Sequence, residues 1–146
     1  MSFFNSINVS ASGLTAERLR MDLISENIAN ANTTRTTSGT PYRRKIAIFR
    51  EQQPDAFAEA LGKANGQFAT SKGVEIAGIA EDQSPFKKEY NPNHPDADAD
   101  GFVSLPNVEV VNEMINMISA SRAYEANITS IGNTKSMAMK ALEIGK

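Results

Sequence analysis

Apolar residues recur at helical spacing near the N-terminus of the chain. Four of them stand seven residues apart, and two more fill intermediate turns of the same stripe. A stripe with this period predicts an amphipathic helix over residues 4–31, about 40 Å long at 1.5 Å per residue. The apolar positions of this predicted helix are Ile7, Ala11, Leu14, Met21, Ile24 and Ile28.

The C-terminal part of the chain has a more regular pattern, in which ten positions follow an unbroken alternation of four- and three-residue steps. Eight of the ten are apolar or aromatic, which is typical of a coiled-coil seam. The pattern predicts a helix over residues 108–142, with Asn107 as its N-cap and Glu109 in its first turn. The ten positions are Val110, Met114, Met117, Ser121, Tyr124, Ile128, Ile131, Lys135, Ala138 and Leu142.

The region between the two helices, residues 33–106, contains all six prolines. Alternating and β-branched residues predict two strands in it, and two further runs are weaker candidates. For residues 54–66, a short helix ended by glycine and a mobile loop are both open. The four candidate strands are residues 42–51, 73–80, 85–90 and 101–105.

These elements predict an α+β protein, with long N- and C-terminal helices that pack as a coiled-coil-like pair and a small central β-rich domain. Residues 1–32 and 107–146 are expected to form one discontinuous helical domain, and residues 33–106 the central domain. Each helix has an apolar stripe that must be buried. Because two helices alone leave much apolar surface uncovered, further copies or related chains are expected to cover the remainder.

Composition and charge exclude several function classes. The chain has 146 residues, a net charge of −2, no cysteine and one histidine, His94, which is expected in a surface loop. Without cysteine there is no disulfide, thiol catalysis or cysteine-based zinc site. The charge gives no reason to expect nucleic acid, and no apolar run is long enough to span a bilayer. We find no catalytic constellation or phosphate-binding loop, so the sequence predicts neither an enzyme nor a cofactor.

The acidic stretch 96–107 is similar to an EF-hand calcium loop. Asp96, Asp98, Asp100 and Gly101 fit the first, third, fifth and sixth positions of that loop. Its twelfth position is an asparagine instead of the bidentate glutamate, and prolines prevent the helix that should precede it. A polar turn is therefore favoured over a metal site, and a calcium-responsive binding module is the alternative from another function class.

Four basic residues cluster near the first candidate strand. They are Arg43, Arg44, Lys45 and Arg50. Because the chain as a whole is not basic, a solvated strand face is favoured over nucleic-acid binding. Contact with an acidic neighbouring subunit is the second interpretation.

Several motifs, in order along the chain, resemble the bacterial flagellar axial proteins that form the rod and hook. At the N-terminus these are "GLTAERLRMDLI" followed by "NIANANTT", and at the C-terminus the long segment that begins "PNVEVVNEMINMISASRAYEAN". The further stretches "GTPYRRK" and "HPDADADGFVSLPN" are most similar to the proximal-rod members of the basal-body rod family. Another rod or hook-associated component is the nearest alternative.

The resemblance implies a structural subunit of the shaft that transmits motor torque to the hook. Its terminal helices are expected to pack side by side in an inner tube, with copies of itself and other rod proteins as partners. The first residues lack a secretory signal, which by that test alone indicates a cytoplasmic protein. The family instead leaves the cytoplasm through the flagellar type III export apparatus, so the resemblance implies an extracytoplasmic rod within the cell envelope. We also expect the terminal helices to be loose in the dilute monomer.

Three asparagines near the end of the first predicted helix, Asn27, Asn30 and Asn32, need a separate explanation. Asparagine is a poor residue inside a helix because its amide competes for backbone groups. Taken alone, helix termination with two solvated amides is favoured. With the resemblance, Asn27 and Asn30 are expected to bind adjacent subunits and to set their register. The N27A substitution is then expected to weaken rod assembly more than it weakens the free subunit.

The predicted subunit interface combines these asparagines with the two apolar stripes. It consists of Ile7, Ala11, Leu14, Met21, Ile24, Asn27, Ile28, Asn30, Val110, Met114, Met117, Ser121, Tyr124, Ile128, Ile131 and Leu142. Lys135 interrupts the second stripe, and it is expected either to reach water or to pair with a carboxylate on a neighbour.

Overall fold

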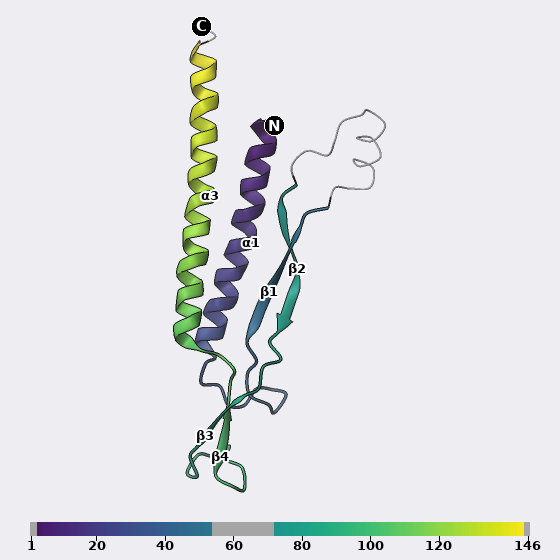
Figure 1. Cartoon of the computed structure of the whole chain (residues 1–146), viewed down its shortest axis with the longest axis vertical. Helices are drawn as coiled ribbons and strands as arrows, with labels where there is room; N and C mark the ends of the chain where they lie inside the picture. The colour runs from purple at the N-terminus through teal and green to yellow at the C-terminus, as the bar shows by residue number, and fades with distance from the viewer. Residues whose placement is uncertain (1–2, 54–71, 145–146) are drawn as a thin grey trace.

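The computed structural model of the protein describes residues 3–53 and 72–144. Two long helices and two β-hairpins form an elongated molecule, in which one hairpin extends past the ends of the helices (Figure 1). The predicted α+β class is confirmed, because helices at both ends of the chain pack together and the strands between them form small antiparallel sheets. The predicted segment 54–66 lies outside the described residues. No helix in the described part of the chain is long and apolar enough to cross a membrane.

Helix α1 spans Phe3–Ala29 and helix α3 spans Val110–Ile144. Neither contains proline, the residue that breaks helical hydrogen bonding. The two helices run antiparallel, so the end of α1 lies beside the start of α3 (Figure 1). Because α1 has 27 residues and α3 has 35, the last turns of α3 extend past the start of α1 (Figure 1).

The longer hairpin pairs β1 (Lys45–Glu51) with β2 (Val74–Glu81). Its register shifts between Ile48 and Phe49, where β2 has one more residue than β1. The hairpin lies along α1, on the side away from α3 (Figure 1). Helix α1 is therefore the middle layer of the molecule, between α3 and a two-stranded sheet.

The shorter hairpin pairs β3 (Lys87–Tyr90) with β4 (Phe102–Leu105) beyond the ends of the helices (Figure 1). The rings of Tyr90 and Phe102 meet edge to face, with their centroids 5.4 Å apart. The turn before β4 needs Gly101, whose φ of 80° is strained for other residues. All four predicted strands are confirmed, although their bounds shift by a few residues.

The buried core of the described residues is small and partly polar. Its apolar members are Ala16, Leu23, Ile24, Tyr42, Val103, Val108 and Ala120. Glu113, Asn27 and Pro106 are the largest side chains that are fully buried. Buried polar groups destabilise a fold unless each finds a hydrogen-bond partner. The partners of Glu113 and Asn27 therefore decide whether this core is stable.

The end of α1 explains one of the asparagines. Asn30 Nδ2 donates to the Glu26 carbonyl at 3.0 Å, and Asn30 Oδ1 accepts from the Thr33 hydroxyl at 3.1 Å. The helix itself ends at Ala29, and Asn32 is exposed in the turn that follows. The Glu26 carbonyl also accepts the backbone N–H of Asn30 at 3.0 Å, so the Asn30 side chain adds a second donor at the end of the helix.

The start of α3 differs from the prediction. Helix α3 begins at Val110, and Asn107 is not its N-cap. The side-chain oxygen of Asn107 instead accepts the backbone N–H of Arg44 at 2.9 Å, and its Nδ2 donates to the Asp82 carbonyl at 2.9 Å. The prediction is wrong because the chain entering β1 and the chain leaving β2 both have backbone groups that need partners here.

Candidate functional site

Small and polar residues line the contact between α1 and α3. The hydroxyl oxygens of Ser10 and Ser130 lie 3.4 Å apart, and a Cβ atom on Gly13 would meet the Asn127 amide nitrogen at 3.0 Å. Ala120 lies in the same seam and is completely buried. Small side chains let helix axes approach closely. The two helices can therefore approach closely at these positions.

One side of α3 turns toward the rest of the chain. The residues on this side follow the predicted spacing of four and three residues, but only half of them are residues of the predicted stripe. This run consists of Glu113, Met117, Ala120, Tyr124, Asn127, Ile131, Thr134 and Ala138. Only alternate members of the predicted stripe belong to it. The predicted stripe is therefore divided between this face and the outward side of α3, and its role as a subunit interface stays a prediction. The cause is that small or hydrogen-bonded polar residues fill the other seam positions, so larger apolar residues remain outside.

Four apolar residues on the outward side of the first turns of α3 form what we call the apolar patch. Val111, Met114, Ile115 and Ile118 are 64%, 50%, 59% and 56% exposed. Their spacing of three and four residues places them on one helix face. Further along this face the residues become polar, beginning with Arg122. A localised exposed apolar surface of this kind marks an interaction site.

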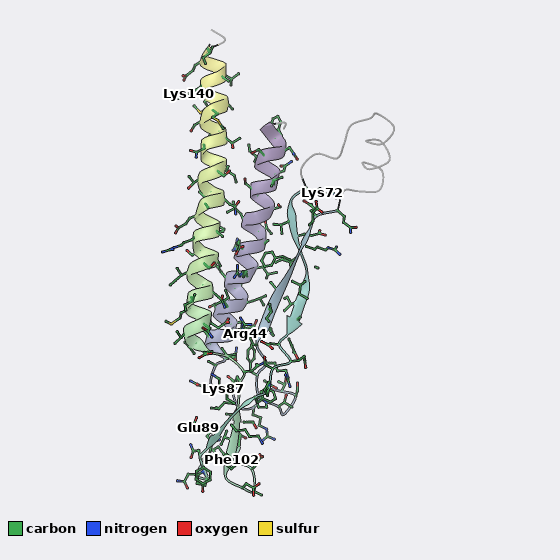
Figure 2. All side chains as sticks on the ribbon, viewed as in Figure 1. Arg44, Lys72, Lys87, Glu89, Phe102 and Lys140 are labelled. Carbon is green, nitrogen blue, oxygen red and sulfur yellow. The ribbon has the colours of Figure 1, made fainter. Side chains whose placement is uncertain are left out.

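The last turns of α3, residues 137–144, form a second exposed apolar surface that we call the overhang. Its large apolar residues, Met137, Met139, Leu142 and Ile144, are all more than half exposed. This part of α3 extends beyond the start of α1 (Figure 1), and Lys140 lies on it, at the far end of the helix from Arg44 (Figure 2). Among the described residues, nothing covers these side chains.

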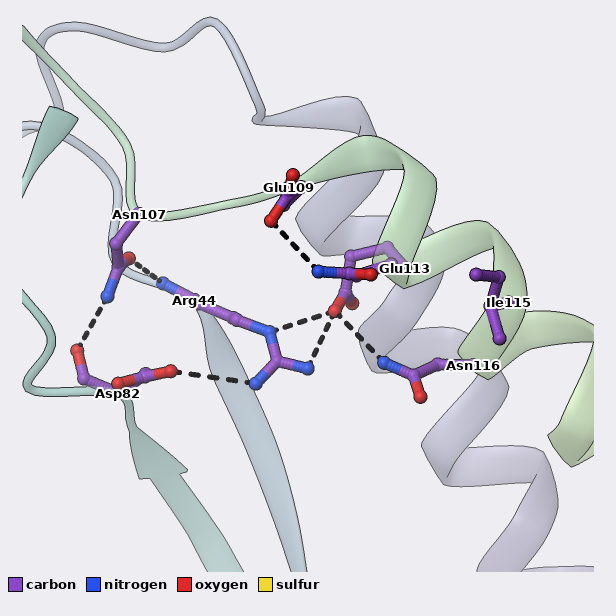
Figure 3. A pocket seen from close by; sticks show the side chains of 8 residues that line it. Arg44, Asp82, Asn107, Glu109, Glu113, Ile115 and Asn116 are labelled. Atoms are coloured by element: carbon purple, nitrogen blue, oxygen red, sulfur yellow. Dashed lines mark hydrogen bonds and ion pairs between the residues drawn. The ribbon is translucent and has the colours of Figure 1, made fainter.

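A buried ion pair joins the start of α3 to the start of β1. Glu113 is 1% exposed, and its Oε1 accepts from Arg44 Nε at 2.8 Å and lies 2.7 Å from a second Arg44 guanidinium nitrogen (Figure 3). The Asp82 carboxylate lies 3.6 Å from the third guanidinium nitrogen. Burying a carboxylate is tolerated only when it has a close cation and hydrogen-bond donors. We call these residues, together with Asn27, Tyr42 and Asn107, the clasp.

Asn27 is the centre of the clasp and uses its whole amide. Its Nδ2 donates to the Lys45 carbonyl at 2.9 Å and to Glu113 Oε2 at 3.0 Å. Its Oδ1 accepts from the Lys45 backbone N–H and from the Tyr42 hydroxyl, both at 2.9 Å. The four bonds equal the full capacity of an amide side chain. One asparagine on α1 therefore holds β1 and α3 in place, and all these bonds lie within one chain.

Tyr42 is the hydroxyl donor in this cluster, and its ionisation is suppressed. Burial, followed by the negative charges of Glu26, Glu113 and Glu81, raises the pKa of Tyr42 to about 12. The pKa of Tyr42 in the folded state lies above its usual value of 10. The contribution of the neutral Tyr42 hydroxyl to folding stability is therefore complete below pH 10 and is lost as pH rises toward 12.

We therefore expect one late tyrosine in an alkaline titration. In absorbance at 295 nm, Tyr42 should ionise near pH 12 or together with unfolding. The Y42F variant should lose this late phase. If its titration still contains a phase near pH 12, the assignment is wrong.

Asp82 lies at the solvent-facing side of the clasp. Hydrogen bonds from the Ser84 hydroxyl and backbone N–H, and then the Arg44 guanidinium, lower the pKa of the Asp82 carboxyl. The contribution of this group to stability is therefore present at neutral pH, and it is lost only as pH falls below the usual range for aspartate.

The structure divides the predicted interface residues into three groups. Ile24 and Asn27 are buried within the chain, so in this conformation neither offers its side chain to a neighbour. The half-buried residues are Ile7, Leu14, Met21, Ile28, Asn30, Met117, Ser121, Tyr124 and Ile131. The exposed residues are Ala11, Val110, Met114, Ile128 and Leu142. Lys135 is exposed, and it has no ion-pair partner in the described part of the chain.

The acidic stretch is a turn between β3 and β4. Asp96 accepts from the Thr34 hydroxyl at 2.8 Å and pairs with Arg35 at 3.7 Å, so it ties this turn to the segment after α1. His94 Nδ1 accepts the backbone N–H of Asp96. Within residues 3–53 and 72–144, no three acidic or histidine side chains are placed to share a metal ion.

Most of the basic cluster is not a solvated strand face. Arg44 belongs to the clasp, Arg43 lies 4.4 Å above the Phe86 ring, and Lys45 pairs with Glu26. The prediction is wrong for these three side chains, because the fold brings groups from other elements against them. Arg50 is still largely exposed on its strand, as predicted, and it pairs with Glu75 across the hairpin at 2.6 Å.

Comparison with known proteins identifies the family. Residues 7–35 match the family described as "Flagella basal body rod protein", and residues 99–144 match "Flagellar basal body rod FlgEFG protein C-terminal". The flagellar basal-body rod protein FlgC of Bacillus subtilis is 45% identical, over 100% of both chains. FlgC of Borreliella burgdorferi is 49% identical over 99% of this chain and 98% of its own, and FlgC of Salmonella typhimurium is 41% identical over 100% of both. The chain belongs to the FlgC family of flagellar basal-body rod proteins.

Membership of the FlgC family makes this protein a structural subunit of the flagellar basal-body rod. The resemblance identified from the sequence motifs is confirmed. The two matched segments contain most of α1 and all of α3, and they include both Asn27 and Glu113. The segments of this FlgC-family chain that match the rod-protein families are thus the helix pair and the clasp residues that lie on it. Sequence analysis missed the clasp, although the buried-side spacing of Glu113 ahead of Met117 and Ala120 was a usable signal.

Proposed function

We propose that the subunit assembles into the rod through the outward surfaces of its helix pair. The apolar patch and the overhang are then buried against copies of the chain and other rod proteins. The observation that carries this proposal is the small-residue seam, which leaves large apolar residues of α3 exposed. Each large apolar side chain that becomes buried contributes about 1.5–3 kcal/mol. Many such contacts acting together resist torsion, so the rod can carry motor torque to the hook.

The clasp gives the subunit the stiffness that this role needs. Arg44, the residue before β1, and Asn27 of α1 both bond to Glu113 of α3, so three parts of the chain meet at one buried point. We therefore propose that the helical part, residues 1–32 with 107–146, and the β-rich part, residues 33–106, move as one body under load. The role of the protein is mechanical, and the proposal assigns it no catalysis and no cofactor.

The proposal also includes the route to the rod. We infer export through the flagellar type III apparatus without a cleaved signal peptide, followed by action in the extracytoplasmic part of the basal body. The absence of cysteine supports this route, since no disulfide can form before or during passage of an unfolded chain.

Replacing Ile118 with aspartate tests the apolar patch. The side chain is 56% exposed, so the free subunit should keep its fold and lose at most about 1 kcal/mol from helix propensity. Rod assembly and swimming should be lost, because a charge is placed in a surface that assembly buries. Thermal unfolding of the purified subunit and electron microscopy of basal bodies measure the two effects.

The matched control is T129D on the same outward face of α3, eleven residues further along and outside the patch. Thr129 is also exposed, and this variant should swim and assemble rods. Normal rods in the I118D variant would contradict the proposed function.

A further inference from the structure

The β3–β4 hairpin has an exposed aromatic surface that is separate from the helix pair. Directly opposite and alternate residues of paired strands share one face. On one face of this hairpin they are Lys88, Tyr90, Phe102 and Ser104. Tyr90 is 65% exposed and Phe102 is 41% exposed, whereas Val103, on the opposite face, is 3% exposed. The face with the two rings is therefore the outward one, and Phe102 lies beyond the ends of the helices (Figure 2).

The two rings of this surface are held in place by their own hairpin. The ring centroids of Tyr90 and Phe102 are 5.4 Å apart, and a Cβ atom on Gly101 would lie 2.9 Å from Tyr90 Cε2. A large side chain that is already ordered loses little conformational entropy when a partner buries it. Tyrosine is also one of the residue types that dominate the binding energy of protein interfaces. The ring pair is thus a preformed anchor for a protein partner.

Lys88 adds a positive charge to the same face. It is exposed and has no ion-pair partner in the described part of the chain. The nearby carboxylates lie elsewhere on the hairpin. Glu89 is on the opposite face of β3, and Asp100 is in the turn at the end of the ring pair away from Lys88. The backbone N–H of Asp98 donates to the Phe102 carbonyl at 2.8 Å along the outer edge of β4. The face therefore favours a partner that has a carboxylate beside an apolar pocket.

The matches to known proteins distinguish this hairpin from the helices. The two rod-protein families match residues 7–35 and 99–144, so β3 lies outside both segments, and the name of the second family covers FlgE, FlgF and FlgG. The FlgC relatives match this chain over 99–100% of its length. A surface that several kinds of rod protein have in common cannot by itself select one neighbour, because specificity is a difference between affinities. The selecting residues are thus expected outside the shared segments, where Lys88 and Tyr90 lie.

We propose that the face formed by Lys88, Tyr90 and Phe102 selects the neighbour of the subunit, and that this neighbour is a rod protein of a different kind. The two rings enter an apolar pocket of that protein, and Lys88 pairs with a carboxylate at the rim of the pocket. This contact goes beyond the proposed function, which concerns the helix pair. The helices supply most of the buried apolar surface, and the hairpin decides which chain is accepted.

Photo-crosslinking in assembled basal bodies tests the contact directly. The variant Tyr90→p-benzoylphenylalanine is expressed in place of the natural subunit, isolated basal bodies are irradiated, and the cross-linked peptides are identified by mass spectrometry. We expect a product that joins the subunit to a different rod protein, at a peptide that contains aspartate or glutamate. The matched control places the same group at Glu89, which is also exposed but is on the opposite face of β3, and it should not give this product.

A charge reversal gives a second, independent readout. K88E should lower the number of rods at least about tenfold, because a like-charge contact replaces an ion pair in the interface. The side chain is exposed, so thermal unfolding of the free K88E subunit should be unchanged. Changing the carboxylate of the cross-linked peptide to lysine should restore rods in K88E. The matched control E89K, on the opposite face, should assemble rods normally.

Cross-links only to copies of the subunit, cross-links to glycan that a muramidase removes, or no product in basal bodies that contain the variant would each overturn this inference. Normal rod numbers in K88E would overturn it as well. All of these results leave the proposed function standing, because that function is tested on α3. Intact rods in the I118D variant would instead contradict the proposed function and leave the cross-link at Tyr90 unaffected.

Discussion

Replacing Arg44 with methionine is expected to destabilise the subunit by about 3–5 kcal/mol. The Glu113 carboxylate, which is 1% exposed, then stays buried without its cation. Methionine retains much of the length of the arginine side chain, so the loss reports the charge more than the packing. The melting temperature should fall by roughly 10 °C or more, and urea unfolding should give the free-energy change.

Two further variants separate the effect of the buried, unpaired charge from the general effect of removing an arginine. R50M removes the same side-chain type six residues further along, inside β1. The Arg50–Glu75 pair is largely exposed, so this substitution should cost less than about 1 kcal/mol. R44M/E113Q should recover a large part of the lost stability, because glutamine has no charge and keeps an oxygen for Asn27. Equal losses in R44M and R50M would mean that the clasp is not a stabilising feature.

The N27A substitution is the second change with a large expected effect, about 3 kcal/mol or more of unfolding free energy. It leaves the backbone N–H and carbonyl of Lys45, the Tyr42 hydroxyl and one oxygen of Glu113 without a partner. All of these groups belong to the same chain. The free, purified subunit should therefore already be destabilised before any assembly takes place.

The neighbouring asparagines are matched controls for N27A. Asn30 makes one bond to a helix-end carbonyl and accepts one from Thr33, so N30A should cost about 1 kcal/mol. Asn32 is exposed, and N32A should change stability by less than about 0.5 kcal/mol. Unfolding curves of the three purified variants give the order. A free N27A subunit as stable as the natural one would favour the original expectation of a role between subunits.

Much of the fold could be predicted from local patterns. The stripe that begins at Ile7 and the C-terminal repeat that contains Met117 and Tyr124 both predicted helices, because helical period depends only on neighbouring residues. The strands that pair Ile48 with Gly78 and Tyr90 with Phe102 were predicted in the same way. The family could also be recognised, since its motifs are contiguous segments of chain.

The candidate site could be predicted only in part. Met114 is exposed and belongs to the stripe that was predicted to be an assembly surface. Ile115 and Ile118 are also exposed, but the predicted stripe did not include them. The clasp as a cluster was not predicted, because Asn27, Arg44 and Glu113 are far apart in the sequence. Only the helical spacing that places Glu113 on the buried face of α3 was a usable signal. Glu113 was not among the predicted interface residues, and Arg44 was interpreted as one of several strand cations.

The sequence by itself determined where helices and strands form, which family the chain resembles and how much apolar surface two helices must hide. Those properties follow from the period and chemistry of adjacent residues. The tertiary structure alone decided which side of α3 meets α1. A close approach at Gly13 and Ala120 and the four bonds of Asn27 favour a seam of small and polar residues. The larger apolar residues of α3 are left outside as a consequence, on the surface that we assign to assembly.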